Sequence, residues 1–212
     1  MAIAFVRGYD FGRSTSTPWN FGNVNATGGN LLVYAIASYN STIHTVRFNS
    51  VDLTLAAKQS SSQHWASLWY MFDPDQGTYA GTLTGTAGQY EYLTVGVYSG
   101  VDTAGLDAVT SKTQTVSTFN TSITTVADGC ITIESTYCNA WGGASMSAGT
   151  DSTMRVQGYG AGSNALFEGT TRVDPAGSDT VSVVMSASRE QTCVLASFAP
   201  QVDARRKIMV VT

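Results

Sequence analysis

The stretch Leu31-Leu32-Val33-Tyr34-Ala35-Ile36-Ala37-Ser38 is apolar from Leu31 to Ala37. A strand with one face in water alternates apolar and polar residues, whereas an uninterrupted apolar run of this length predicts burial on both faces. We therefore expect residues 31–38 to form a central strand that spans the core of a β-sheet protein.

The rest of the chain also has the pattern of β-strands. In residues 90–98, Leu93, Val95 and Val97 alternate with more polar side chains, as is typical of a half-buried antiparallel strand. Further strands are expected at residues 46–55, 65–72, 78–83, 110–125, 130–137, 181–185 and 192–198. Helical periodicity is not sustained over three turns anywhere. The prediction is an all-β fold, an antiparallel two-sheet β-sandwich.

Three parts of the chain are expected to differ in structure. Residues 1–29 form an N-terminal strand and a long loop, residues 30–199 the β-sandwich domain, and residues 200–212 a C-terminal tail. The aromatic residues of the long loop are expected to cover one end of the sandwich (Tyr9, Phe11, Trp19 and Phe21). Within the domain, residues 45–55 predict a hairpin around Asn49-Ser50, because Asn tolerates the left-handed conformation of a tight turn.

The chain carries few charges: 11 Lys and Arg, 15 Asp and Glu, and a formal net charge of −4. A general nucleic-acid binder needs a basic surface that neutralises phosphates, so this balance predicts no nucleic-acid partner. No apolar run approaches the ~20 residues that span a bilayer. The first residues lack the long apolar region and cleavage site of a signal peptide. We therefore expect no membrane association and synthesis in the cytoplasm.

The three cysteines, Cys130, Cys138 and Cys193, predict buried free thiols. If residues 130–138 form one strand, a rise of about 3.3 Å per residue places Cys130 and Cys138 roughly 26 Å apart. A disulfide requires Cα atoms within about 7 Å of each other. Cys193 could pair with either, but three thiols kept reduced in a cytosol are the expectation.

Residues that carry chemistry are sparse. The two histidines, His44 and His64, are expected at the surface or at a strand edge, because no sequence motif supplies a nucleophile for them. Sandwich-fold glycosidases use paired carboxylates two residues apart on a strand, and none of the glutamates has such a partner (Glu91, Glu134, Glu168 and Glu190). Asp73 and Asp75, or Asp102, could bind calcium, but a polar turn is the commoner reason for such residues. We expect no enzyme activity, no cofactor and no metal.

Two alternatives stay open for Trp141, which lies among glycines in residues 140–149. An exposed tryptophan in such a loop is a stacking platform for a sugar ring. Alternatively, its side chain folds over the end of the sandwich, as most large aromatic side chains are buried. Nearby, the glycines of residues 158–162 have the wrong spacing for a dinucleotide-binding loop and indicate a flexible loop or bulge.

The order of features between Asn30 and Asp107 resembles that of a known group of domains. The segments that carry the resemblance are Asn30-Leu31-Leu32-Val33-Tyr34-Ala35-Ile36-Ala37, Val46-Arg47-Phe48-Asn49-Ser50-Val51-Asp52-Leu53-Thr54, Ala66-Ser67-Leu68-Trp69-Tyr70-Met71, Asp73-Pro74-Asp75-Gln76-Gly77-Thr78-Tyr79 and Val97-Tyr98-Ser99-Gly100-Val101-Asp102. They are similar to jelly-roll-like β-sandwich domains of phage virion proteins and bacterial surface proteins, in feature order over roughly residues 30–199. The group usually has Asn-Gly where this chain has Asn49-Ser50.

The resemblance implies a structural role, since the group has no shared catalytic motif to transfer. In phages, such domains look like head decoration (cement) proteins or modules of tail fibres. A lone domain with short extensions fits decoration better. The implied protein is a non-enzymatic virion component that stabilises the head as a homo-oligomer on the major capsid protein. The alternative is a carbohydrate-binding or host-adhesion module of a tail fibre, with a glycan ligand.

The last twelve residues combine charge and strand propensity. Arg205, Arg206 and Lys207 precede an apolar segment that contains Ile208 and Val210. Such a segment is expected to add to a sheet edge, where backbone hydrogen bonds give affinity, and the basic residues could meet an acidic surface. Two alternatives stay open: an assembly arm that binds a capsid or sister subunit, or pairing with the edge of its own domain.

Overall fold

The computed structural model describes residues 2–40, 43–61, 64–86, 90–138, 145–158, 164–169 and 173–202, without the side chains of residues 43 and 44. Within these ranges the regular elements are β-strands, and all pairings between them are antiparallel. A helix capable of crossing a membrane is not found in them. The predicted all-β antiparallel sandwich is confirmed.

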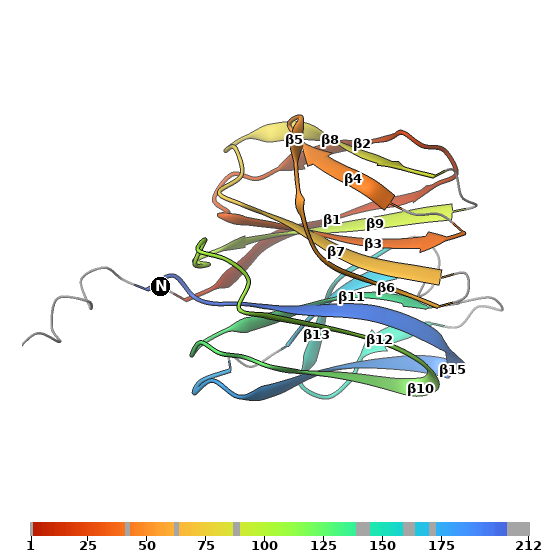
Figure 1. Cartoon of the computed structure of the whole chain (residues 1–212), viewed down its shortest axis with the longest axis vertical. Helices are drawn as coiled ribbons and strands as arrows, with labels where there is room; N and C mark the ends of the chain where they lie inside the picture. Colours follow the sequence, from red (N-terminus) through yellow and green to blue (C-terminus); the bar gives the residue numbers. More distant parts are fainter. Residues whose placement is uncertain are drawn as a thin grey trace, which may run out of the picture.

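Three sheets lie one above another (Figure 1). The upper sheet has the strand order β2-β8-β4-β5, the central sheet β1-β9-β3-β7-β6, and the third sheet β10-β15-β11-β14-β13, with β12 paired to β15. The strands are β1 (Ala4–Ser14), β2 (Trp19–Asn25), β3 (Leu31–Tyr39), β4 (Ile43–Phe48), β5 (Val51–Asp52), β6 (Thr54–Ser60), β7 (His64–Phe72), β8 (Thr78–Gly85), β9 (Tyr90–Ser99), β10 (Ala108–Thr124), β11 (Ile131–Cys138), β12 (Met146–Ala148), β13 (Ser152–Gln157), β14 (Asn164–Gly169) and β15 (Ser178–Phe198). The structure thus adds a third sheet to the two that the sequence predicts.

Strand β3 lies in the middle of the central sheet, between β9 and β7. Its side chains alternate between two cores: Leu32, Tyr34 and Ile36 face the upper sheet. Leu31 and Val33 face the third sheet instead. Both faces of β3 are therefore covered, which confirms the prediction from its uninterrupted apolar sequence.

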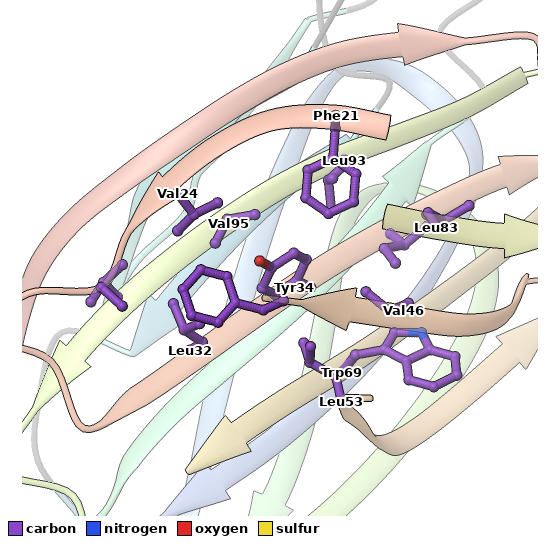
Figure 2. Close-up of a cluster of buried hydrophobic side chains, with 14 residues drawn as sticks. Phe21, Val24, Leu32, Tyr34, Val46, Leu53, Trp69, Leu83, Leu93 and Val95 are labelled. Carbon is purple, nitrogen blue, oxygen red and sulfur yellow. The ribbon is translucent and has the colours of Figure 1, made fainter. Parts of the chain in front are cut away.

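The core between the upper and central sheets combines aliphatic and aromatic side chains (Figure 2). The upper-sheet side chains in it are Phe21, Val24, Val46, Phe48 and Leu83. From the central sheet, Trp69 reaches this core and donates its indole N–H to the Ser67 hydroxyl at 3.0 Å. Burying one side chain of this kind stabilises a fold by roughly 1.5–3 kcal/mol, so the cluster attaches the upper sheet firmly.

Residues 4–25 contain two strands, and the expectation of a long loop there is wrong. β1 pairs with β9 and β2 pairs with β8. Phe21 lies in the upper core, and the Phe11 ring packs against it with centroids 5.2 Å apart. The aromatic residues of this segment therefore line a core between two sheets. Frequent glycine, serine and asparagine residues obscure the alternation of apolar and polar side chains in this segment. Local propensity does not favour strands here, and the strands form because they pair with β8 and β9.

The third sheet curls back on itself through its two longest strands, β10 and β15. Residues 108–116 of β10 pair with residues 189–197 of β15, and residues 118–124 then pair with residues 178–184. The register shift at this point coincides with the turn of both strands in Figure 1. We call residues 118–124, residues 178–184 and β12 the outer layer. A separate apolar core lies between the outer layer and the rest of the sheet.

Residues from both limits of the described chain meet at one end of the sandwich. The Gly100 carbonyl accepts a hydrogen bond from the Gln201 N–H at 2.8 Å, and a Cβ on Gly100 would lie 2.4 Å from the Ala2 carbonyl oxygen. We call this the near end. β3 runs from it toward the opposite, far end, and its nine residues at ~3.3 Å each span roughly 30 Å.

The three cysteines are buried and free, as predicted. Cys130 lies just before β11 and Cys138 ends it, so the strand holds the two apart. Cys193 belongs to β15 and lies in the core beneath the outer layer. None of the three therefore forms a cross-link.

The predicted hairpin at Asn49-Ser50 is confirmed. Phe48 pairs with Val51 across the turn, and both turn residues have positive φ, 48° for Asn49 and 64° for Ser50. Two consecutive left-handed residues are typical of the tight turn that matches strand twist. The Asn49 side chain also donates a hydrogen bond to Asp75 at 2.7 Å.

Replacing Ser50 with glycine is expected to stabilise the protein. A non-glycine residue in the left-handed region costs roughly 1–2 kcal/mol, and glycine is free of this strain. We expect Ser50→Gly to raise the free energy of unfolding by about 1 kcal/mol in urea titrations. The control is Ser50→Ala, which removes the hydroxyl and keeps Cβ. An equal gain from alanine would show that the backbone strain is not the cause.

Candidate functional site

Five aromatic side chains gather at the far end, in the space between the central and third sheets. They come from the ends of four strands: Tyr39 from β3, His64 from β7, Tyr90 and Tyr92 from β9, and Tyr137 from β11. The His64 ring lies between two tyrosines, with centroids 5.2 Å from Tyr39 and 5.0 Å from Tyr137. Tyr92 contacts Tyr137 at 6.3 Å and Tyr90 at 6.5 Å. We call these five residues the far-end cluster.

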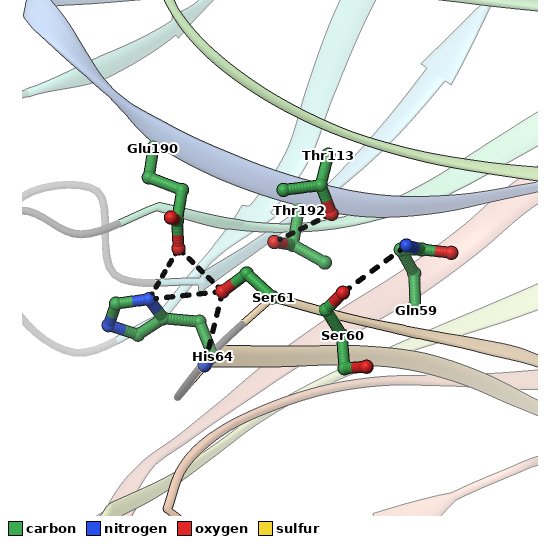
Figure 3. Close-up of polar contacts among 7 residues, drawn as sticks. All are labelled: Gln59, Ser60, Ser61, His64, Thr113, Glu190 and Thr192. Atoms are coloured by element: carbon green, nitrogen blue, oxygen red, sulfur yellow. Dashed lines mark hydrogen bonds and ion pairs between the residues drawn. The ribbon is translucent and has the colours of Figure 1, made fainter.

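A polar pair holds His64 in place (Figure 3). His64 Nδ1 lies 2.6 Å from Oε1 of Glu190 on β15, and the Ser61 hydroxyl donates to the same oxygen at 2.5 Å. His64 is buried and Glu190 is partly exposed. The contact joins the central sheet to the third sheet at the point where their apolar core ends.

The hydrogen bonds determine the charge of Glu190. Partial burial acts to raise the pKa of its carboxyl, but the hydrogen bonds from Ser61 and His64, with the charge interaction with His64, outweigh burial and lower that pKa. Glu190 is therefore an ionised acceptor at neutral pH. A carboxylate on Nδ1 orients an imidazole ring and fixes which nitrogen is left for another partner.

The other ring nitrogen of His64, Nε2, is buried and has no hydrogen-bond partner within the part of the chain that the structure describes. Figure 3 shows it pointing away from both Glu190 and Ser61. In a serine hydrolase the nucleophile faces Nε2 and the acid faces Nδ1. Here Ser61 lies on the Nδ1 side, so this trio is not arranged for nucleophilic catalysis.

The expectation of a surface or edge position is wrong for His64. Its strand alternates, so that His64 shares a face with Ala66 and Leu68, and both of these are buried against the third sheet. The sequence shows this alternation. It does not show the partner of His64, because Glu190 lies 126 residues away in the chain. The side chain of His44 lies outside the described part of the structure.

The remaining candidate acids do not converge. Glu134 of β11 and Glu168 of β14 are on neighbouring strands, but Glu168 pairs with Ile133, so the two glutamates point to opposite faces of the third sheet. Glu168 accepts two hydrogen bonds from the Arg155 guanidinium, at 2.8 and 3.2 Å. Such a bidentate pair neutralises a buried carboxylate. It ties β13 to β14.

Of the proposed calcium ligands, Asp75 accepts the Asn49 hydrogen bond and Asp102 accepts one from the Ala104 N–H at 3.1 Å. Asp73 occupies a turn position with a φ of 47°. In the described ranges, no group of three or more histidine, cysteine, aspartate or glutamate residues is placed to hold a metal ion. Polar turns account for these aspartates.

Several predicted site residues fall outside the described ranges. They are Trp141, the candidate stacking platform, and Arg205, Arg206, Lys207, Ile208 and Val210 of the candidate assembly arm. Trp141 follows Cys138, the last residue of β11, by three residues in the sequence. Comparisons with models of protein families, with curated proteins and with solved structures find no match.

The His64–Glu190 contact predicts a dependence of stability on acid. A carboxyl whose pKa is lowered by folding stabilises the fold above its ordinary pKa, and this contribution is lost as the pH falls through the lowered value. We expect Glu190→Gln to reduce the free energy of unfolding by about 1 kcal/mol at neutral pH. At low pH, once the pH has fallen below the lowered pKa of Glu190, the two proteins should converge, because the wild-type carboxyl is then also neutral. An equal loss at both pH values, measured by urea titration, would contradict this role of its charge.

Proposed function

We propose that this protein is a non-enzymatic structural component of a phage virion, a decoration or cement protein that stabilises the head. The proposal places it on the major capsid protein as a homo-oligomer, without nucleic-acid or membrane partners. The observation that carries it is the near end, where Val126 and Val202 expose large apolar side chains, and Val202 immediately precedes the basic and apolar segment 203–212 in the sequence. The resemblance of the sequence to virion domains supplies the biological context.

The near end has the surface expected of a contact site. Val126 and Val202 are 77% and 55% exposed, more than any other large hydrophobic side chain in the described ranges. Both belong to ordered backbone: Asp107 accepts hydrogen bonds from the N–H groups of Val126 and Ala127, and Gln201 is bonded to Gly100. Large apolar side chains held rigidly in water favour association with a partner.

The interior of the fold supports a structural role. Its buried charges join elements together: Arg155 ties β13 to β14, and His64 with Glu190 ties β7 to β15. Asp107 connects the turn at residues 126–127 to β15 through Ser197. The three free thiols suit assembly in a reducing host cytoplasm before incorporation into the virion.

Deleting residues 204–212 tests the assembly arm. We expect the truncated protein to keep its melting temperature, because the described members of the three cores all precede residue 199, and to lose oligomerisation or binding to purified heads. Sedimentation velocity and co-sedimentation with heads measure the two. If the truncated protein unfolds, the segment belongs to the domain; if assembly is unchanged, the segment is incidental.

The near end is tested separately by placing a charge on it. Val126→Asp and Val202→Asp are expected to weaken head binding without changing the melting temperature. The matched control is Val51→Asp, because Val51 is 53% exposed but lies on β5 of the upper sheet. Electron cryomicroscopy of the virions then locates the protein: regular density on the shell supports decoration, and density confined to the tail contradicts it.

A carbohydrate-binding or host-adhesion module of a tail fibre is the second candidate, and the far-end cluster favours it. Tyr39 and Tyr90 are its partly exposed members, and tyrosine rings are the kind of group that stacks on a sugar. Trp141 follows in the sequence three residues after Cys138, where β11 ends. The cluster lies at the opposite end of β3 from the near end, so a protein anchored through the near end would present it outward.

This second role predicts that Trp141→Ala abolishes binding on a glycan array and leaves the melting temperature unchanged. Trp65→Ala is the control, because Trp65 lies on β7 beside His64 but faces away from the cluster. If Trp141 covers the core instead, its loss should destabilise the protein by roughly 3–5 kcal/mol. Wild-type protein that binds no glycan would remove this candidate.

A further inference from the structure

The curled third sheet encloses a carboxyl group that none of the contacts above explains. Glu134 projects from β11 toward the outer layer and is fully buried there. One carboxyl oxygen accepts a hydrogen bond from the Thr136 hydroxyl. The other, Oε2, is buried without a hydrogen-bond partner in the described part of the chain. Burying a carboxylate without full pairing is costly, so the neutral acid is favoured.

The surroundings of Glu134 do not supply a free positive charge. Lys112 of β10 faces it, but the Lys112 ammonium donates to the Asn120 carbonyl at 2.9 Å and lies 5.3 Å from the Phe119 ring centre. From β15 come the Cys193 thiol and Asp179, which accepts a hydrogen bond from Thr132. β11 itself adds Cys138. The side chains that β12, β13 and β14 add to this core are uncharged (Met146, Ala148, Met154, Ala165 and Phe167).

A hydrogen bond crosses the same interior. Thr121 belongs to the outer layer and Cys193 to the facing part of β15, and the Thr121 hydroxyl lies 3.0 Å from the Cys193 sulfur. Both also lie beside the Glu134 carboxyl. The hydrogen bond that joins the outer layer to β15 in this region therefore lies directly beside the Glu134 carboxyl.

We propose that Glu134 is a pH-operated latch for the outer layer: the neutral acid keeps the layer closed, and ionisation of Glu134 favours its opening. Burial raises the pKa of this carboxyl from its ordinary 4.5 to about 7, although the hydrogen bond from Thr136 and the neighbouring Thr121 hydroxyl, Cys193 thiol and Lys112 charge act in the opposite direction. Since folding raises the pKa, the stabilisation is complete below the ordinary value and is lost as the pH rises through about 7. This inference is independent of the proposed function.

The cysteines provide the readout. Cys138 and Cys193 lie in the core that the outer layer covers, whereas Cys130 lies near Ala127 at the near end and is bonded to its carbonyl at 3.1 Å. A thiol reagent reaches a buried cysteine only when the protein opens locally. The ratio of Cys193 to Cys130 modification, followed by peptide mass spectrometry, therefore reports opening of the outer layer.

In the wild-type protein we expect this ratio to increase at least about tenfold between about pH 5.5 and about pH 8.5. The midpoint should lie near the pKa of Glu134. Dithiodipyridine is a suitable probe because it reacts with thiols across this range. This measurement needs no variant, and a ratio that does not change with pH would overturn the latch.

Glu134→Gln keeps the shape of the side chain and removes its charge. We expect its ratio to stay at the low-pH value across the whole range. The matched control is Glu168→Gln on β14, whose carboxylate faces the opposite side of the sheet and pairs with Arg155; this variant should keep the wild-type pH dependence. If Glu134→Gln opens with pH as the wild type does, another group controls the layer and the proposal is wrong.

Discussion

Strand β3 is buried on both faces, and the rest of the fold provides its cover. A β-strand that is apolar on both faces would expose one of them in a simple half-solvated sheet, and such surfaces promote aggregation. The upper sheet covers Leu32 and Tyr34, and the third sheet covers Leu31 and Val33. The central sheet is thereby an internal layer, and its neighbours must each present an apolar face to it.

Stacked sheets strongly constrain ionisable groups. A charged side chain that points between two layers loses its water, so it needs a partner or must become neutral. Glu168 has Arg155, and Glu190 has His64 at the open end of the layers. Glu134 faces a closed interior where the nearby Lys112 ammonium is bonded to the Asn120 carbonyl, and the burial raises the pKa of the Glu134 carboxyl. The same physical cost thus produces a structural tie, an oriented histidine and a titratable latch.

Much of the fold could be predicted because strand patterns and turn chemistry are local. The apolar run at β3 and the left-handed residues Asn49 and Ser50 appear in the structure as expected. The expectation of a half-buried strand at residues 90–98 is wrong, because β9 lies in the central sheet and is covered on both faces. The strands within residues 8–25 do not follow from the sequence, because the glycine and asparagine content there is typical of loops and these strands depend on pairing with distant segments. The candidate site was largely missed for a related reason, since His64 becomes distinctive only beside Glu190.

The sequence by itself determined the all-β class, the central strand, the hairpin and the free thiols. The first three depend on residues that are neighbours in the chain, and the thiols of Cys130 and Cys138 are kept apart by the length of the strand between them. Only the tertiary structure decided that three sheets stack, that the long strands β10 and β15 turn back to form an outer layer, and which face of each strand is closed. Antiparallel pairing joins segments that are far apart in sequence. A carboxyl such as Glu134 therefore has the same local sequence whether it faces water or a dry core, and only the folded layers determine which.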